Sequence, residues 1–120
     1  MKTLQAPIDT LNGFDLPLPP PTRSTMYAVA FDLDTETLQK IYDGSSWNNA
    51  YLEIRRILEN EGFEWRQGSV YFGNPEKVDA VTCVLAVQKL ASSLSWFSQA
   101  VRDVRMLRIE ENNDLLPAVQ

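Results

Sequence analysis

The chain has 120 residues, of which 44% are hydrophobic and 22% charged, a composition suited to one folded domain. Its formal net charge is −5, which argues against tight, sequence-independent binding of nucleic acid but allows one local site. Histidine is absent and Cys83 is the one cysteine, which excludes a histidine general base, an intramolecular disulfide and an ordinary zinc site. Any chemistry must use carboxylates, hydroxyls, Arg, Lys or a hard metal ion.

The sequence has no feature typical of a membrane or exported protein. It contains no run of about 18 apolar residues, and its first residues lack the basic and then apolar pattern of a secretion signal. We therefore expect a cytoplasmic protein that does not contact a membrane.

Residues 1–25 differ in composition from the rest of the chain. They hold five of the seven prolines, and the run at 16–21 favours an extended, polyproline-like backbone. Two interpretations of this N-terminal extension stay open. It is either a tail without fixed structure or a strap that docks on the sheet, on a dimer mate or on a partner.

The folded domain is predicted to span residues 26–110, followed by a C-terminal tail at 111–120. Apolar periodicity and turn signals predict a strand at 27–33, a short helix at 35–42, a helix at 47–60 capped by Ser45 or Ser46, hairpin strands at 63–66 and 69–72, a helix at 78–94, a helical turn at 95–100 and a strand at 102–110. The helix at 78–94 should bury Ala80, Cys83, Val84, Val87, Ala91 and Leu94, in a stripe widened by Val81, Leu85 and Leu90.

This order of elements, βαββαβ, is typical of an α+β ferredoxin-like fold. Right-handed crossovers place the strands in the antiparallel order 4-1-3-2, with both long helices on one face. In the first strand the large residues share one face, whereas Ala28, Ala30 and Asp32 share the other. Small side chains on that second face indicate a surface that something else approaches closely.

The topology brings polar residues from three segments to one end of the sheet. Strands 3 and 4 flank strand 1 and run opposite to it, so their beginnings lie beside its end. The residues expected there are Asp32, Gln67, Ser69, Arg102, Asp103 and Arg105. This end of the sheet is therefore the candidate site.

Two interpretations of the acidic pair stay open. Asp32 and Asp103 bind Mg²⁺, or one of them acts as an acid or base because the other raises its pKa. Arg102 or Arg105 would then hold a phosphate, and Ser69 would orient a phosphate oxygen or a ribose hydroxyl. The structural alternative is that the Asp at the strand end caps a turn and that Asp103 forms surface ion pairs.

Other residues allow weaker functional interpretations. Asp32 and Asp34 resemble the nucleophile loop of haloacid-dehalogenase phosphotransferases, but the threonine spacing differs and the chain is too short for that fold. Trp65 and the other tryptophans can stack on bases or belong to the core, and Arg55 and Arg56 can touch RNA or face solvent.

Several motifs resemble the VapD (virulence-associated protein D) family. They are MYAVAFDL at 26–33, WNNAY at 47–51, GFEWRQGSVY at 62–71, WF at 96–97 and VRDVR at 101–105. They follow the family's order and cover roughly residues 26–110, and the run at 62–71 is the most specific. Residues 1–25 have no counterpart in this pattern.

The resemblance implies a ferredoxin-like homodimer with endoribonuclease activity, often from a toxin–antitoxin locus. The family positions tied to activity fall on Asp32, Ser69 and Asp103, and a further implicated position falls on Leu38, an apolar residue that we expect to pack. We expect an endoribonuclease that cleaves single-stranded RNA, with Arg102, Arg105, Gln67 and Leu38 as substrate-binding residues, Mg²⁺ at Asp32 left open, and a cognate antitoxin protein as partner. The alternative is a non-catalytic dimeric binding or regulatory module.

Overall fold

The computed structural model describes residues 25–42 and 46–120, so residues 1–24 of the predicted extension lie outside it. The predicted strands and helices are confirmed, with bounds shifted by one or two residues, and the C-terminal tail holds one further element, a short 3-10 helix that was not predicted. They are β2 (Met26–Leu33), α2 (Thr35–Ile41), α3 (Asn49–Asn60), β3 (Phe63–Gln67), β4 (Val70–Gly73), α4 (Ala80–Ser93), α5 (Phe97–Ala100), β5 (Val101–Ile109) and a C-terminal 3-10 helix, η1 (Leu116–Val119).

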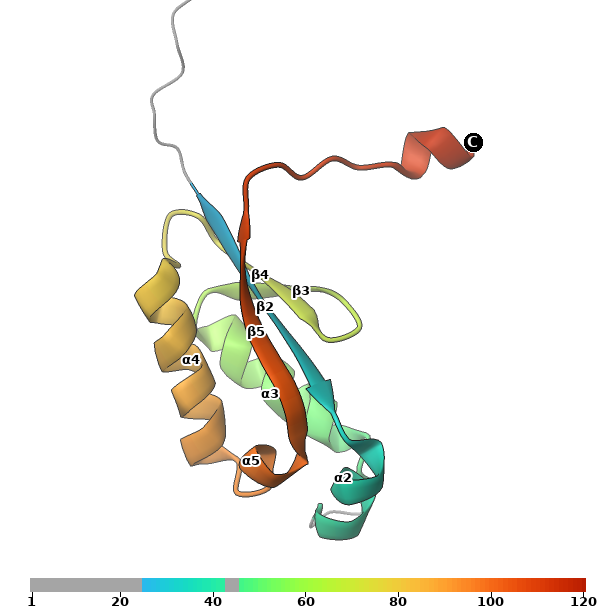
Figure 1. The fold of residues 1–120 in the computed structure, drawn as a ribbon, viewed down its shortest axis with the longest axis vertical. Coiled ribbons are helices and arrows are strands. Elements are labelled where there is room, and N and C mark those ends of the chain that lie inside the picture. The colour runs from blue at the N-terminus through green and yellow to red at the C-terminus, as the bar shows by residue number, and fades with distance from the viewer. Residues whose placement is uncertain (1–24, 43–45) are drawn as a thin grey trace, which may run out of the picture.

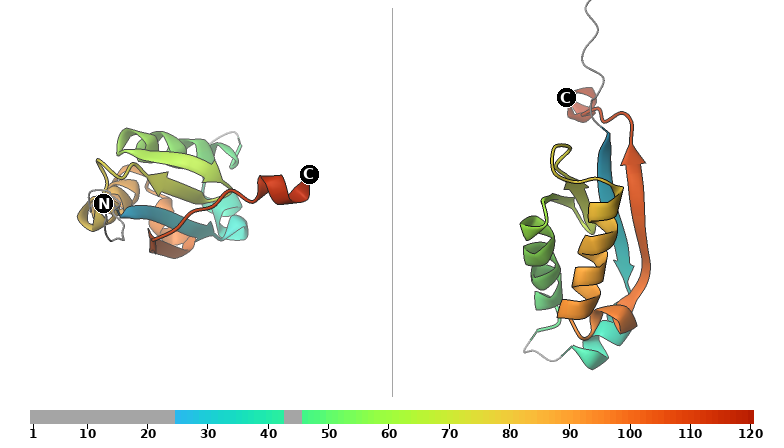
Figure 2. Two further views of the ribbon diagram at one scale, coloured as in Figure 1. Left: turned by 90° about the horizontal axis from the view of Figure 1, so that it is seen from above. Right: turned by 90° about the vertical axis from the view of Figure 1, so that its left-hand side faces the viewer.

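The four strands form one antiparallel sheet in the order β3-β4-β2-β5 (Figure 1). This is the predicted ferredoxin-like order, counted from the opposite edge. Helices α3 and α4 lie on the same face of the sheet, while no helix of the described residues covers the other face (Figure 2). We call these two faces the helix face and the open face.

The core lies between the helix face and the two long helices. The central strand β2 sends Val29, Phe31 and Leu33 into it, and each of these is at most 7% exposed. From the helices it receives buried side chains that include Ile54, Leu58 and Leu90. The alternation of side chains in a strand then places Ala28, Ala30 and Asp32 on the open face, as predicted.

Helix α4 buries only part of the predicted stripe, and it buries Ala86, which was not predicted. Its fully buried residues are Cys83, Ala86 and Leu90, whereas Val84 and Leu85 are more than half exposed. The helix is apolar almost all round, so periodicity cannot identify the side that packs against β2. The burial of Cys83 is confirmed, and burial raises the pKa of its thiol. Among the described residues, no helix has the length and apolar character to cross a membrane.

The start of α3 also differs from the prediction. Asn48 is its N-cap residue and makes no side-chain capping bond, while the Ser46 carbonyl accepts from the Asn49 N–H at 3.0 Å. Ser46 is therefore not the cap, and Ser45 lies outside the described residues. At the other end of α3 the chain reverses at Gly62, whose φ of +101° favours glycine.

Candidate active site

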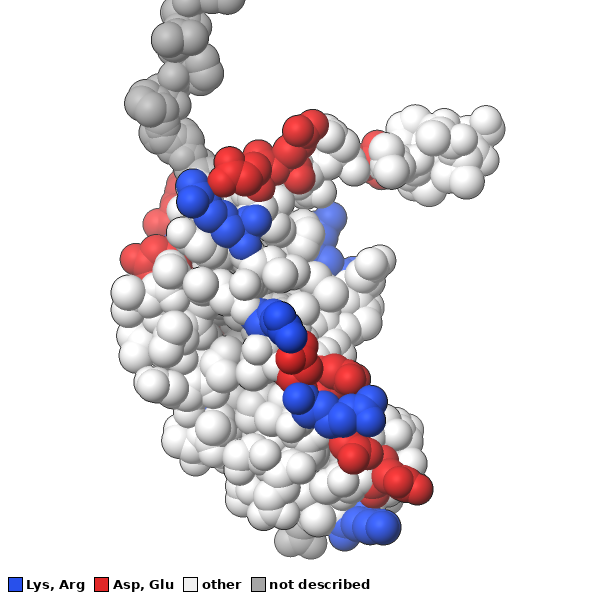
Figure 3. All heavy atoms as spheres, in the orientation of Figure 1, with Lys and Arg blue, Asp and Glu red and all other residues white. Residues whose placement is uncertain are grey.

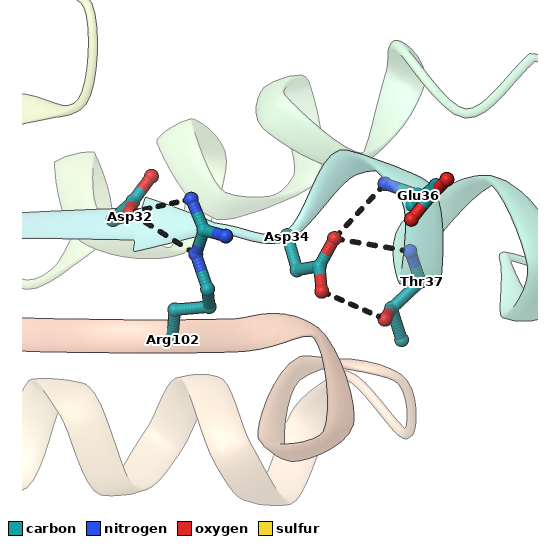
Figure 4. Close-up of polar contacts among 5 residues, drawn as sticks. All are labelled: Asp32, Asp34, Glu36, Thr37 and Arg102. Atoms are coloured by element: carbon teal, nitrogen blue, oxygen red, sulfur yellow. Dashed lines mark hydrogen bonds and ion pairs between the residues drawn. The ribbon is translucent and has the colours of Figure 1, made fainter.

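Two aspartates lie at the end of β2, and their surroundings differ (Figure 4). Asp34 is the N-cap of α2, because its carboxylate accepts from the N–H groups of Glu36 at 3.1 Å and Thr37 at 3.4 Å. The Thr37 hydroxyl donates to the same carboxylate at 3.1 Å. These hydrogen bonds, chiefly those from Thr37, lower the pKa of Asp34. Asp34 thus has a structural role, which removes the support for a dehalogenase-like pair of acids.

Asp32 instead forms a pair with Asp103 across the sheet. The two residues are register partners of β2 and β5, immediately before an irregularity in that pairing. Side chains opposite one another in antiparallel strands have Cβ atoms about 4.5–5.5 Å apart and point to the same face. The two carboxylates therefore share the open face at this end of the sheet.

Each of these carboxylates also contacts an arginine of β5. The Arg102 guanidinium donates to Asp32 Oδ2 from Nη2 at 3.2 Å and from Nε at 3.3 Å (Figure 4). The Arg105 Nε donates to both oxygens of Asp103 at 3.1 Å. The side chains of Asp32 and Asp103 are 58% and 49% exposed, so the two pairs remain open to solvent.

This group of four, the carboxylate–arginine cluster, contributes little to stability. Exposed ion pairs are worth about 0–1 kcal/mol. Figure 3 shows acidic and basic side chains gathered over the end of β2 and the beginning of β5. Carboxylates that can take a proton thus lie next to guanidinium groups that can bind a phosphate.

Ser69 is next to this cluster but on the other face. Its carbonyl accepts from the Phe31 N–H at 3.2 Å, one residue before Asp32. Because Ala30 pairs with Val70, the side chain of Ser69 lies with Phe31 on the helix face. The structure therefore brings together Asp32, Asp103, Arg102 and Arg105, and it corrects the expectation that Ser69 would join the acids directly.

The Ser69 side chain lines a pocket of about 260 Å³ between α3 and the β3–β4 hairpin. The pocket is formed by Tyr51, Leu52, Arg55, Trp65, Gly68, Ser69 and Tyr71. The pKa of Tyr51 is raised, first by burial and second by the negative charge of Asp32. The pocket and the carboxylate–arginine cluster therefore lie near one another, on either side of the hairpin turn. Sequence reasoning considered Trp65 and Arg55 singly and missed the pocket, because the packing of a helix on a hairpin creates it.

The two remaining predicted substrate contacts lie elsewhere. Gln67 borders a hollow of about 680 Å³ on the open face, which Arg66, Val70, Phe72 and residues 112–115 of the C-terminal tail also line. Leu38 is fully buried in α2, which corrects the expected contact with substrate. Its packing holds α2, and with it the end of β2, against the core.

The acidic pair has the oxygen donors that suit magnesium. Mg²⁺ is usually held by one or two carboxylates together with water, and Asp32 and Asp103 supply two on one face. Within residues 25–42 and 46–120, no group of three or more acidic or cysteine side chains could hold a metal ion. A metal here would therefore keep a largely aqueous shell and compete with the two arginines.

Comparisons with known proteins match one continuous region of the chain, which contains the sheet and both long helices. The family model described as CRISPR associated protein Cas2 matches residues 25–115. The endoribonuclease VapD 2 of Riemerella anatipestifer is 56% identical over 94 residues, which cover 78% of this chain and 99% of that protein. An endoribonuclease VapD homolog of Helicobacter pylori is 53% identical over 95 residues, covering 79% and 97%. The endoribonuclease VapD of Dichelobacter nodosus is 43% identical over 95 residues.

Proposed function

Because the chain belongs to the VapD family, we propose that it is an endoribonuclease that cleaves single-stranded RNA at the end of β2. The observation that carries the site assignment is the register pairing of Asp32 with Asp103, each joined to an arginine at 3.1–3.2 Å. These charges are exposed and contribute little to folding, so they are available to bind a phosphate and to take part in proton transfer. Unpaired RNA suits the site because its backbone can bend toward a group on a protein surface.

In this proposal Asp32 removes the proton from the attacking hydroxyl. No histidine exists in the chain to do so, and an ionised carboxylate is the remaining common base. Asp103 assists from the opposite strand by holding the same hydroxyl or by returning a proton to the leaving oxygen. Arg102 and Arg105 lie beside the two acids, where they offset the charge that grows on the phosphate.

Magnesium is a further part of the proposal. Asp32 would hold the ion, with Asp103 as second ligand, and the bound ion would supply charge neutralisation of the phosphate. Each carboxylate would then exchange its arginine for the ion. The arginine released would move to the phosphate, so metal binding and substrate binding would support one another.

We also propose that the active species is a homodimer formed through the open face. That face carries the small, partly exposed residue Ala30, which permits close approach, and Leu107, which is 44% exposed. A domain of this size buries only about two thirds of its unfolded surface, so a second copy on this face would add apolar burial. The acidic pairs of two protomers would then lie on the same interface.

The toxin role within a toxin–antitoxin system rests on the family resemblance, and the surface offers a place for a cognate antitoxin. Val84 of α4 and Val104 and Met106 of β5 line an apolar cavity of about 230 Å³ beside the edge of the sheet. All three are at least 36% exposed. In a bacterial host, expression of the wild type should arrest growth and expression of Asp32→Asn should not; equal growth in the two cultures would contradict the toxin role.

The activity itself is tested with purified protein and end-labelled RNA. We expect internal cleavage of single-stranded RNA, little cleavage of a duplex of the same sequence, and loss of cleavage in Asp32→Ala. EDTA in a parallel reaction tests the metal, and added Mg²⁺ should restore any loss. Cleavage by Asp32→Ala at the wild-type rate would refute the site, and binding without cleavage by the wild type would favour the regulatory module.

A further inference from the structure

The pocket beside the hairpin turn contains an aromatic platform that the cleavage chemistry does not use. Trp65 is 40% exposed, although it is the largest side chain of β3. Its orientation is held by a hydrogen bond from its Nε1 to the Gly68 carbonyl at 2.9 Å. The Arg55 guanidinium lies over its ring, 4.8 Å from the centroid, and Glu59 binds that guanidinium at 3.0 Å. The indole is thus held by contacts with Gly68 and Arg55 and still remains 40% exposed.

The pocket has the size and the groups for one ring system. Its volume of about 260 Å³ lies just below the 300–1,000 Å³ of sites that enclose drug-sized ligands. Leu52 adds an apolar wall, while Tyr51 and Ser69 bring hydroxyl groups that can donate and accept hydrogen bonds. Tryptophan rings and guanidinium planes are both surfaces on which unpaired bases stack.

The pocket is also at the right place along a bound strand. Ser69 is hydrogen-bonded through its carbonyl to Phe31, the residue before Asp32. Because β4 begins only at Val70, an RNA strand bound at the carboxylate–arginine cluster can pass around the hairpin turn to the helix face. The raised pKa of Tyr51, to which the charge of Asp32 contributes, agrees with this short separation.

We propose that this pocket binds one unpaired nucleobase of the RNA, stacked on the Arg55–Trp65 pair, for the nucleotide next to the cleaved bond. Ser69 and Tyr51 read the edge of that base, so the pocket determines where in a single strand the enzyme cuts. This inference rests on the proposed ribonuclease function and adds a specificity-determining site to it. Ser69 thereby acts in substrate selection, from the face opposite the acids.

The test compares matched variants on matched substrates. Trp65→Ala should raise KM for a single-stranded oligoribonucleotide about tenfold, with kcat little changed, because stacking on one base is lost. Trp65→Phe keeps a ring and should stay close to the wild type. Arg55→Ala should resemble Trp65→Ala, whereas Arg56→Ala, which is exposed on the same helix but outside the pocket, should not.

An abasic substrate separates base recognition from a structural effect. The oligoribonucleotide carries one abasic position, placed in turn on each side of the cleaved bond. The wild type should lose about tenfold in kcat/KM at one position, and Trp65→Ala should lose nothing further there. A wild type that cleaves abasic and intact RNA equally would overturn the pocket while leaving the ribonuclease in place.

Binding without cleavage distinguishes the failure of the pocket from the failure of the enzyme. A 2′-deoxy oligonucleotide should quench tryptophan fluorescence in the wild type, and Trp65→Phe should remove most of that quenching. If the wild type cleaves no RNA but shows this Trp65-dependent quenching, the proposed function falls and the pocket stands. If quenching is unchanged in Trp65→Phe, base stacking at this pocket is refuted.

Discussion

The two faces of the sheet differ sharply at the end of β2. On the open face, Asp32 and Asp103 form two exposed ion pairs with arginines and are the proposed acid–base groups. On the helix face, one residue away, Ser69 lines a pocket with an exposed indole that suits stacking and hydrogen bonding. Under the two proposals, the end of one strand would present charged groups for the reaction on one face and a pocket for base recognition on the other.

The largest effect should come from the open face. Asp103→Asn is expected to lower kcat by about 100-fold or more, because a group that transfers a proton in the reaction typically contributes that much. The double variant with Asp32→Asn should lose little more than either single variant, since the proposed mechanism makes the two acids act as a unit. Glu110→Gln is the matched control, because Glu110 pairs with Arg108 at 3.0 Å at the far end of β5. Additive losses would contradict a shared function.

The next effect concerns the open face as an interface. Leu107→Glu places a charge among apolar side chains and should weaken dimerisation at least about tenfold, as measured by analytical ultracentrifugation. Leu85→Glu changes a leucine that is more exposed, 56% against 44%, on the outer side of α4 and should leave the dimer intact. A dimer that survives Leu107→Glu and dissociates in Leu85→Glu would place the interface on the helices.

A smaller effect is expected on the helix face. Ser69→Ala should raise KM about three- to tenfold and leave kcat within about twofold, because one hydrogen bond to the substrate is lost. Ser92→Ala, at the exposed end of α4, is the control. A loss confined to kcat would instead make Ser69 a partner of the acids and erase the contrast between the faces.

The smallest effect should come from Asp34, whose hydrogen bonds begin α2. Its folded-state pKa lies below the ordinary value of 3.8, so its stabilising effect is present above that pH and is lost as pH falls through the folded pKa. Asp34→Asn cannot titrate there, and its melting temperature should fall less than that of the wild type between pH 5 and about 2.5. Glu36→Gln keeps the Asp34 cap, so its melting temperature should fall with pH as that of the wild type does. Identical acid profiles for all three proteins would refute the role of the cap.

The fold could be predicted from the sequence because clear turn residues separate its helices and strands. Gly62, Gly68 and the break after Gly73 fall between segments of clear period, and the order of those segments leaves one ferredoxin-like solution. That topology also predicted that Asp32 and Asp103 lie at the same end of the sheet, and the structure adds that they are direct register partners. The buried side of α4 could not be predicted in full from the sequence. Apolar residues lie on most sides of this helix, and only its packing against β2 determines which of them are buried.

The face of Ser69 was missed for a related reason. Topology predicts which strand ends meet, but the face on which a side chain lies depends on the register to a single residue. Here Ala30 pairs with Val70, which places Ser69 with Phe31 and away from Asp32. To predict the pocket around Ser69, one would also need the distance between α3 and the hairpin, and no local sequence pattern gives that distance.

The position of β5 at the edge of the sheet has a consequence for handling the protein. An edge strand nine residues long presents unpaired N–H and C=O groups to which a strand of another molecule can add. Charged residues are the usual protection, and β5 carries Arg102, Asp103, Arg105 and Arg108 along this edge. Neutralising Arg102, Asp103 or Arg105 to test the proposed site therefore also removes protection against ordered aggregation, and light scattering should accompany every assay of such variants.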